Sequence, residues 1–494
     1  MFLMFFCISF VYTILRDTKD TLIVTGSGAE TIPFLKVWGV VPGAIIFTLI
    51  YAKLSNILSK ERLFYVTIMP FLVFFALFAV LIYPNREALH PHAFADFLQS
   101  VLPVGFAGLI GIFRNWTYSL FYILAELWGS AVLSLMFWGF ANDIMRVSEA
   151  KRFYTLLGLG ANIALLFSGQ AIVYFSDIRK HVPAGVDAWQ ISLNYLMALV
   201  VLAGIAIIGL YWWINRNVLT DSRFYDPADV KKAKEKPKMS MLESMKFLIN
   251  SKYMLCLAFL VIAYGVAINL FEVSWKGQLK LQYPNPNDYS AFMGNFSFFT
   301  GVTTIVMMFI GGYIIRKKGW GFGAMMTPVV LLITGVLFYT FVIFGDHVSL
   351  YVAMLGTTPL FLGVMIGAAQ NIMSKSTKYA LFDPTKEMAY IPLDQESKVK
   401  GKAAIDVLAA RLGKSGGSMI QQGLLVVLGT MAAITPYVAG AAVVMIIMWM
   451  FAVRVMNRKF VALTELRAAE ELQEAQEKKA AQTAHIGVLG GAGA

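Results

Sequence analysis

The amino-acid sequence predicts an all-α membrane protein with about twelve membrane-spanning helices, arranged in two halves of six. Hydrophobic residues make up 58% of the 494 positions and charged residues only 14%, whereas soluble domains carry about 25% charged residues. The mean hydropathy is +0.67, and residues 434–453 form a run without a charge, which is typical of a helix that crosses a bilayer. A hydrophilic segment at 216–252 divides the apolar runs equally, a common plan among transporters.

The apolar runs set the expected elements in chain order. The N-terminal half, 1–215, is expected to hold spans near 1–20, 32–57, 63–83, 115–141, 150–175 and 191–214. The C-terminal half, 253–456, is expected to hold spans near 253–275, 290–315, 321–344, 349–374, 402–430 and 434–454. Residues 216–252 form a cytoplasmic linker in this interpretation, and 84–103 should contain a short interfacial helix. The tail, 457–494, is expected to be helical to about 483 and disordered from 487 on.

Positive charge is distributed unevenly between the predicted connections. The net charge of +12 would suggest a nucleic-acid partner in a soluble chain, but here the charges mark topology, and no nucleic acid is expected. With the N-terminus inside, the inner connections hold 24 lysines and arginines and the outer ones seven. Because these residues are enriched in cytoplasmic loops, we expect a multi-pass protein of the cell (inner) membrane with both termini in the cytoplasm. No basic region precedes the first apolar run, so no cleavable signal peptide is predicted.

Four charged residues fall inside predicted spans, namely Lys36, Glu126, Glu272 and Lys414. A charge within a bilayer costs at least a few kcal/mol unless it faces water, a counter-charge or a ligand. One lysine and one glutamate lie in each half, as expected for a central cavity that handles a polyanion. Two alternatives stay open. Lys36 and Glu272 could extend to the outer interface, and Glu126 and Lys414 could belong to buried ion pairs that bind no ligand.

The predicted span 402–430 is unusually polar for a membrane helix. At about 100° per residue, one stripe holds Arg411, Lys414, Ser415, Ser418 and Gln422. Nearby glycines allow neighbouring helices to pack closely. Asp406 adds a further charge to the same helix. We interpret this span as a cavity-lining helix whose cations bind an anion.

Further charged residues at the ends of spans are candidates for gates. The end of the first span carries Arg16, Asp17, Lys19 and Asp20, which could form an external gate or a loop ion pair. Lys276 lies near Glu272 in the seventh span. At the inner end of the tenth span, Lys375 and Lys378 could form an inner gate or a topological anchor.

Several chemistries are not supported by the sequence. The segment Gly413–Ser415 reads GKS, but the phosphate-binding loop needs a glycine at the position of Leu408 and a preceding strand. His90 and His92 lack a third ligand nearby in sequence, so no metal site is expected. The two cysteines lie in apolar runs and imply no disulfide framework. Neither an enzyme activity nor a cofactor is expected.

Several long motifs resemble one known family. The stretches LRDTKDTLIVT, AELWGS, FWGFAN, KPKMSMLES, PNPNDYSAFMGNFSF, SKSTKYALFDPTKEMAYIPLD and GKSGGSMIQQG are similar to the ATP/ADP translocases of chlamydiae, rickettsiae and plastids, and most closely to the chlamydial type. The resemblance extends over about residues 1–455. It implies a major-facilitator-like fold and exchange of ATP for ADP, in many cases with phosphate. The chain departs from the pattern at Val11, where the resemblance implies an asparagine.

The resemblance also implies roles for individual residues. The family's important intramembrane charges fall on Lys36, Glu126, Glu272 and Lys414, the residues already selected by burial cost. The two lysines, helped by Arg411, would bind phosphates, and the two glutamates would pair with those lysines when the site is empty. We expect Asn269 and three aromatic residues to hold the adenine, with the protein acting as a monomer. The aromatic candidates are Tyr118, Tyr122 and Tyr264.

Other functions remain possible at this point. Relatives in the family include nucleotide–proton symporters, in which Glu126 or Glu272 would carry the proton, and exchangers of broader nucleotide specificity. A membrane-embedded enzyme acting on a lipid phosphate could also use buried lysines and glutamates. A passive anion channel is a further alternative, and counter-flow kinetics would separate it from a carrier.

Overall fold

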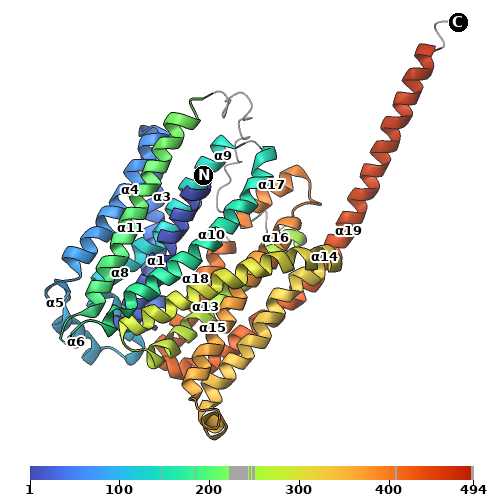
Figure 1. The fold of residues 1–494 in the computed structure, drawn as a ribbon. Helices are drawn as coiled ribbons and strands as arrows, with labels where there is room; N and C mark the ends of the chain where they lie inside the picture. Colours follow the sequence, from blue (N-terminus) through green and yellow to red (C-terminus); the bar gives the residue numbers. More distant parts are fainter. Residues whose placement is uncertain are drawn as a thin grey trace.

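The computed structural model describes residues 1–145, 147–183, 185–221, 243, 246, 251–405 and 409–490. Within these ranges the chain is helical and contains no strand. Figure 1 shows two groups of helices side by side, with the end of the last helix projecting from the bundle. Asp406 and most of the predicted linker lie outside the described residues.

The N-terminal half comprises the elements up to residue 218. Its order is α1 (Phe2–Ser27), α2 (Thr31–Phe34), the π-helical η1 (Leu35–Val40), α3 (Val41–Ile57), α4 (Lys60–Leu77), η2 (Phe78–Ile82), α5 (Arg86–Leu89), α6 (His92–Val101), η3 (Val104–Phe106), α7 (Ala107–Arg114), α8 (Trp116–Trp128), the π-helical η4 (Gly129–Phe137), α9 (Trp138–Ile144), α10 (Val147–Ser176), η5 (Asp177–Lys180), α11 (Ala188–Trp213) and η6 (Ile214–Val218). The short helix predicted within 84–103 is present as α6, and its Phe94, Phe97 and Val101 are exposed.

The C-terminal half begins at residue 252. Its order is α13 (Lys252–Gln282), α14 (Pro286–Ala353), α15 (Pro359–Thr377), the π-helical η7 (Lys378–Phe382), α16 (Asp383–Met388), α17 (Gln395–Ala404), α18 (Ala410–Leu428) and α19 (Met431–Gly490). The long α14 contains a break at Gly319, whose φ of 82° lies in the left-handed region, where glycine is tolerated without steric cost. This break falls between the predicted spans 290–315 and 321–344.

The structure supports a polytopic membrane protein and corrects several predicted boundaries. Eight segments of the described chain are long and apolar enough to cross a membrane by length and composition, while the count of twelve stays a prediction. The first helix continues to Ser27 rather than ending near 20. The turn predicted at 345–348 lies instead at 354–358, because the helix resumes after a local break at Phe344. In the tail, α19 continues to Gly490 although its composition predicts disorder from 487, since no proline interrupts the tail.

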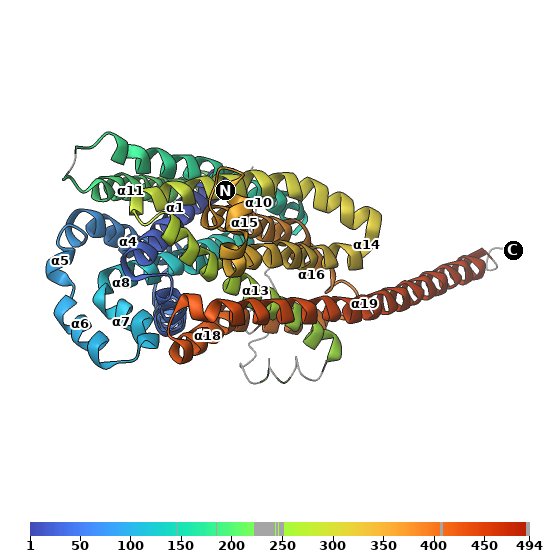
Figure 2. The same cartoon turned by 90° about the horizontal axis from the view of Figure 1, so that it is seen from below.

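Close helix packing joins the two halves along α10 and α14. A Cβ atom added at Gly169 would lie 2.6 Å from the carbonyl oxygen of Gly294, and one at Gly301 would lie 2.8 Å from that of Asn162. Small residues of this kind let membrane helices approach each other closely. Figure 2 shows α10 running along α14, with α1 on its other side. The centre of the bundle is therefore lined by helices from both halves.

Polar contacts close one end of this interface. Asn287 Nδ2 donates to the carbonyl oxygen of Ser176 at 3.1 Å and to Ser192 Oγ at 2.7 Å. Arg179, just after α10, also forms an ion pair with Asp288 at the start of α14. The polar contacts of Asn287 and Arg179 thus join the two halves at this end of the bundle.

Candidate functional site

Three π-helical segments contain or closely follow residues that the sequence predicts for the site. Lys36 is the second residue of η1, Gly129 opens η4 three residues after Glu126, and Lys378 opens η7. A π-helical turn inserts an extra residue into a helix, which rotates the side chains that follow, and such turns occur often at functional sites. The backbone is therefore irregular where the sequence predicts polar function.

Asp20 of α1 joins the two halves by binding two lysines. Lys19 Nζ lies 2.8 Å from Asp20 Oδ1 and 3.0 Å from Glu126 Oε1. Lys276 Nζ, on α13, lies 2.8 Å from Asp20 Oδ2 and 3.1 Å from Glu272 Oε1. The side chains of both lysines and of Asp20 are only 2% exposed, so these charges depend on each other for compensation.

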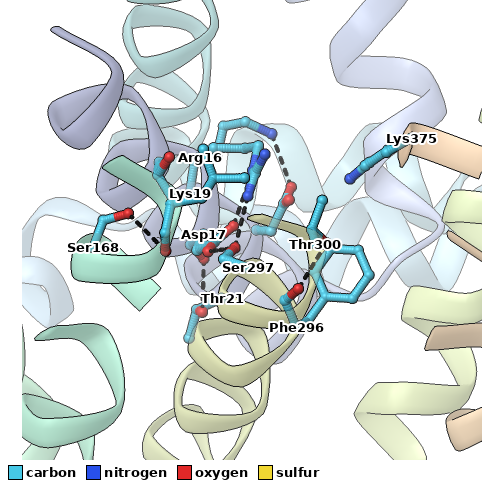
Figure 3. Close-up of polar contacts among 12 residues, drawn as sticks. Arg16, Asp17, Lys19, Thr21, Ser168, Phe296, Ser297, Thr300 and Lys375 are labelled. Atoms are coloured by element: carbon cyan, nitrogen blue, oxygen red, sulfur yellow. Dashed lines mark hydrogen bonds and ion pairs between the residues drawn. The ribbon is translucent and has the colours of Figure 1, made fainter. Parts of the chain in front are cut away.

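Arg16 and Asp17 extend this arrangement toward α14, as Figure 3 shows. Arg16 Nε lies 3.0 Å from Asp17 Oδ1, and its Nη2 donates to Ser297 Oγ at 2.7 Å. Ser297 in turn donates to Asp17 Oδ2 at 2.5 Å. Lys375 of α15 approaches from the other side, with its Nζ 3.7 Å from Glu272 Oε1 and 4.8 Å from the centre of the Phe296 ring.

Lys36 lies in a different setting, bound to an amide instead of a carboxylate. Its Nζ donates to Asn269 Oδ1 at 2.8 Å. Asn269 Nδ2 donates to Ser418 Oγ at 3.1 Å and to the backbone carbonyl of Lys414. Within the described ranges, neither Lys36 nor Lys414 has a carboxylate within ion-pair distance, although both interact electrostatically with Glu126. Lys36 is partly exposed and Lys414 is exposed.

We call these residues together the central layer. They comprise the free lysines, Lys36 and Lys414, and the ion-paired cluster of Arg16, Asp17, Lys19, Asp20, Glu126, Glu272, Lys276 and Lys375. The layer holds six cations and four carboxylates, so its positive charge is in excess. Excess charge in a low-dielectric setting attracts an anion.

Several predicted pairings and positions are corrected by this geometry. Glu126 and Glu272 pair with Lys19, Lys276 and Lys375, not with the free lysines. The reason is that α1 continues beyond residue 20, which brings its charged side chains inside the bundle. A loop ion pair at residues 16–20 is therefore wrong. Extension to the outer interface is also wrong for Lys36 and Glu272, because both bind partners inside the bundle.

The predicted aromatic residues do not gather around the free lysines. Tyr118 stacks on Tyr83 at a centroid distance of 5.9 Å and meets His90 edge-on at 5.1 Å. Tyr264 stacks on Phe382 at 5.2 Å. Of the three, only Tyr122 reaches the ion-paired cluster, where Lys19 Nζ lies 3.8 Å from its ring centre.

Two further predicted residues lie apart from the ion pairs. Lys378 pairs with Asp383 at 2.7 Å, within η7 and the start of α16. Arg411 is exposed on α18, one turn before Lys414. Sequence reasoning missed Ser297 and Phe296, because an uncharged serine and a phenylalanine in an apolar helix give no signal of a polar contact.

The chain is similar to a family of known transporters. The family described as "TLC ATP/ADP transporter" matches residues 1–460. "ADP,ATP carrier protein 1" of Chlamydia trachomatis serovar D is 63% identical over 96% of this chain and 90% of its own length. "ADP,ATP carrier protein 1, chloroplastic" of Arabidopsis thaliana is 53% identical over 96% of this chain and 75% of its own length. A Rickettsia bellii protein named "ADP,ATP carrier protein 1" is 43% identical over 93% and 92%.

Solved structures share the fold at low sequence identity. A bacterial homologue of the iron transporter ferroportin, in an inward-facing state, gives a TM-score of 0.57 at 12% identity and covers 92% of this chain and 98% of its own. A point mutant of the nucleoside transporter NupG gives 0.51 at 11% identity over 91% and 99%. These likenesses confirm the predicted all-helical, major-facilitator-like fold. With the match over residues 1–460 and the 63% identity over nearly the whole chain, the chain belongs to the TLC ATP/ADP transporter family.

Proposed function

We propose that this protein exchanges ATP for ADP across a membrane and binds the nucleotide phosphates at the free lysines. Its membership of the TLC family and its likeness to proteins named as ADP,ATP carriers support this function. The main observation for the binding site is that, within the described ranges, two cations of the central layer lack a carboxylate partner, whereas the others have one. These two are Lys36 and Lys414. A phosphate binds such groups through charge-assisted hydrogen bonds.

Asn269 connects the two free lysines in this proposal. It accepts from Lys36 Nζ at 2.8 Å and donates to the backbone of Lys414. Because Lys36 belongs to the N-terminal half and Asn269 and Lys414 to the C-terminal half, a phosphate bound between the lysines touches both halves. Arg411 on the same helix supplies a further cation as the anion enters.

Alternating access follows from rocking of residues 1–215 against residues 253–456, with 216–252 as the linker. The contacts of Asn287 and Arg179 hold one end of the interface closed. Arg411 and Lys414 are exposed on α18, so we infer that the site opens on the side of the bundle that these residues face. Obligate exchange results if the halves reorient easily only when the free lysines are loaded.

The membrane orientation and the ionic balance belong to the same proposal. The asymmetry of lysines and arginines between connections favours cytoplasmic termini in a cell membrane. Burial of Arg16, Lys19 and Lys276 inside the bundle leaves still fewer cations in the outer loops. Import of ATP against ADP moves about one extra negative charge inward, so phosphate leaving with ADP would balance it. The protein acts as a monomer in this proposal.

Counter-flow into proteoliposomes tests the function. Vesicles are loaded with ADP, with ADP and phosphate, or with buffer, and the entry of labelled ATP is measured. We expect rapid entry only into vesicles that contain ADP, and a higher rate if phosphate leaves as well. Entry into empty vesicles that collapses with a protonophore would instead indicate proton symport, and equal entry into all three would indicate a channel. Lys414→Ala should abolish ADP-dependent entry.

A further inference from the structure

The three tyrosines first considered for the adenine have no free ring face. Tyr83 and His90 cover Tyr118, and Phe382 covers Tyr264. Tyr122 is fully buried, with Lys19 over its ring. A nucleobase that binds by stacking needs an accessible aromatic face, so its platform must lie elsewhere in the central layer.

Tyr12 of α1 meets this requirement. It lies one helical turn before Arg16, which places both side chains on the same face of α1. Tyr12 is partly exposed, and within the described part of the chain no other ring contacts it. Its phenol interacts electrostatically with Glu126, Arg16 and Lys19, so it adjoins the central layer. Glu126 also interacts electrostatically with both free lysines, so the same carboxylate is coupled to Tyr12 and to those lysines.

The Tyr12 ring packs against the backbone at Gly129. A Cβ atom at this position would lie 2.6 Å from Tyr12 Cε2, which is closer than carbon atoms pack, and 3.2 Å from Cδ2. Gly129 is also the first residue of the π-helical η4. The absence of a side chain at Gly129 thus lets the Tyr12 ring lie against this irregular turn.

A second ring approaches from the other half. Tyr379 in η7 is 50% exposed, and Lys378 Nζ lies 4.3 Å from its ring centre. Its phenol interacts electrostatically with that of Tyr12, and the two rings come from opposite halves of the bundle. Because Tyr12 belongs to one half and Tyr379 to the other, closure of the interface would bring both rings closer to a flat ligand.

We propose that Tyr12, whose ring packs against Gly129, is the stacking platform for the purine base of the transported nucleotide. This inference rests on the proposed function and assigns the base, whereas the free lysines take the phosphates. Tyr12 is accordingly a specificity-determining residue. Its loss should weaken binding of ligands with a base and leave binding of bare polyphosphate unchanged.

The test compares two probes on the purified full-length protein in detergent. ATP and inorganic tripolyphosphate are each titrated by calorimetry against the natural protein and against Tyr12→Ala, Tyr12→Phe and Gly129→Ala. Stacking of one base on an aromatic ring contributes enough that we expect about a tenfold loss of ATP affinity in Tyr12→Ala. Tyr12→Phe should bind ATP as tightly as the natural protein does. Gly129→Ala should have an ATP affinity between those of the natural protein and Tyr12→Ala. Tripolyphosphate affinity should stay the same in all four proteins.

Two controls keep the outcomes distinguishable. Tyr174→Ala removes a tyrosine that is 73% exposed on α10 and should change neither affinity. Lys36→Ala should weaken both probes, because it removes a phosphate ligand. If the natural protein binds no ATP, the proposed function fails. If it binds ATP and Tyr12→Ala binds it equally well, the assignment of the base fails while the function stands. If Tyr12→Ala loses as much affinity for tripolyphosphate as for ATP, the assignment of the base to Tyr12 also fails.

Discussion

The ion-paired cluster and the free lysines lie in one layer of the same bundle but differ in how their charge is compensated. Asp20 binds Lys19 and Lys276 at 2.8 Å each, and these side chains are almost fully buried. Lys36 instead binds the neutral Asn269, and Lys414 is exposed. A paired buried cation contributes to folding, and its loss leaves its partner uncompensated. An unpaired one is available to a ligand. The difference indicates that location inside a membrane does not by itself identify a binding residue.

The largest expected effect is on stability, from breaking the ion-paired cluster at Asp20. Asp20→Ala removes the carboxylate shared by Lys19 and Lys276 across the two halves. Each lysine keeps a glutamate partner, so we expect a loss near the lower end of the range for buried pairs, about 3 kcal/mol. Thermal unfolding in detergent measures it.

A matched surface pair provides the control for Asp20. Asp143 pairs with Lys60 at 2.7 Å, but the two side chains are 49% and 82% exposed. Exposed pairs contribute little, so Asp143→Ala should unfold near the temperature of the natural protein. Equal unfolding temperatures for Asp20→Ala and Asp143→Ala would contradict a structural role for the cluster.

A smaller effect is expected when a free lysine is turned into a paired one. Asn269→Asp places a carboxylate where the amide oxygen lies 2.8 Å from Lys36 Nζ. The new ion pair occupies the lysine and repels phosphate, so ATP affinity should fall about tenfold, or about 1.4 kcal/mol. Unfolding temperature should change little, because the ion pair offsets the donor bonds that Asn269 loses. Calorimetric titration with ATP measures the affinity.

The control for Asn269→Asp is another asparagine-to-aspartate substitution, made outside the central layer. Asn142 at the end of α9 is exposed, and its Oδ1 accepts from Tyr154 at 2.5 Å. Asn142→Asp preserves that acceptor and should leave ATP affinity unchanged. Unaltered ATP affinity in Asn269→Asp would show that Lys36 does not bind the phosphates.

The smallest expected effect is on the pH dependence of stability and comes from His90. This histidine lies outside the membrane-spanning segments and, in the part of the chain that the structure describes, is buried without an ion pair. Burial lowers the pKa of His90 from its ordinary value of 6.5, and the neighbouring His92 adds to this. The neutral form is thus favoured in the folded protein, so its contribution to stability is present above pH 6.5 and is lost as the pH falls. Thermal unfolding at about pH 7.5 and about pH 5.5, on either side of that value, should show a larger decrease for the natural protein than for His90→Gln. Identical decreases would refute this origin.

Sequence reasoning could predict the class of fold and the four intramembrane charges, because both depend on hydropathy and on the cost of burying charge. It could not predict their partners, since spacing along one helix does not fix which helices are neighbours. The expected partners of Glu126 are the free lysines, and in the structure it binds Lys19. Tyr12 gives no signal in the sequence, because its role depends on the missing side chain of Gly129, which lies on another helix.

The most direct test of the central claim is the thermal stabilisation of the purified protein by ATP, measured for the natural chain and for Lys414→Ala. Because a ligand that binds only the folded state stabilises it, ATP should raise the unfolding temperature of the natural protein. Lys414→Ala should unfold at the natural temperature without ATP and show no rise with it. A variant that unfolds much earlier without ATP, or that is stabilised as strongly as the natural protein, would show that Lys414 is not a free, phosphate-binding lysine.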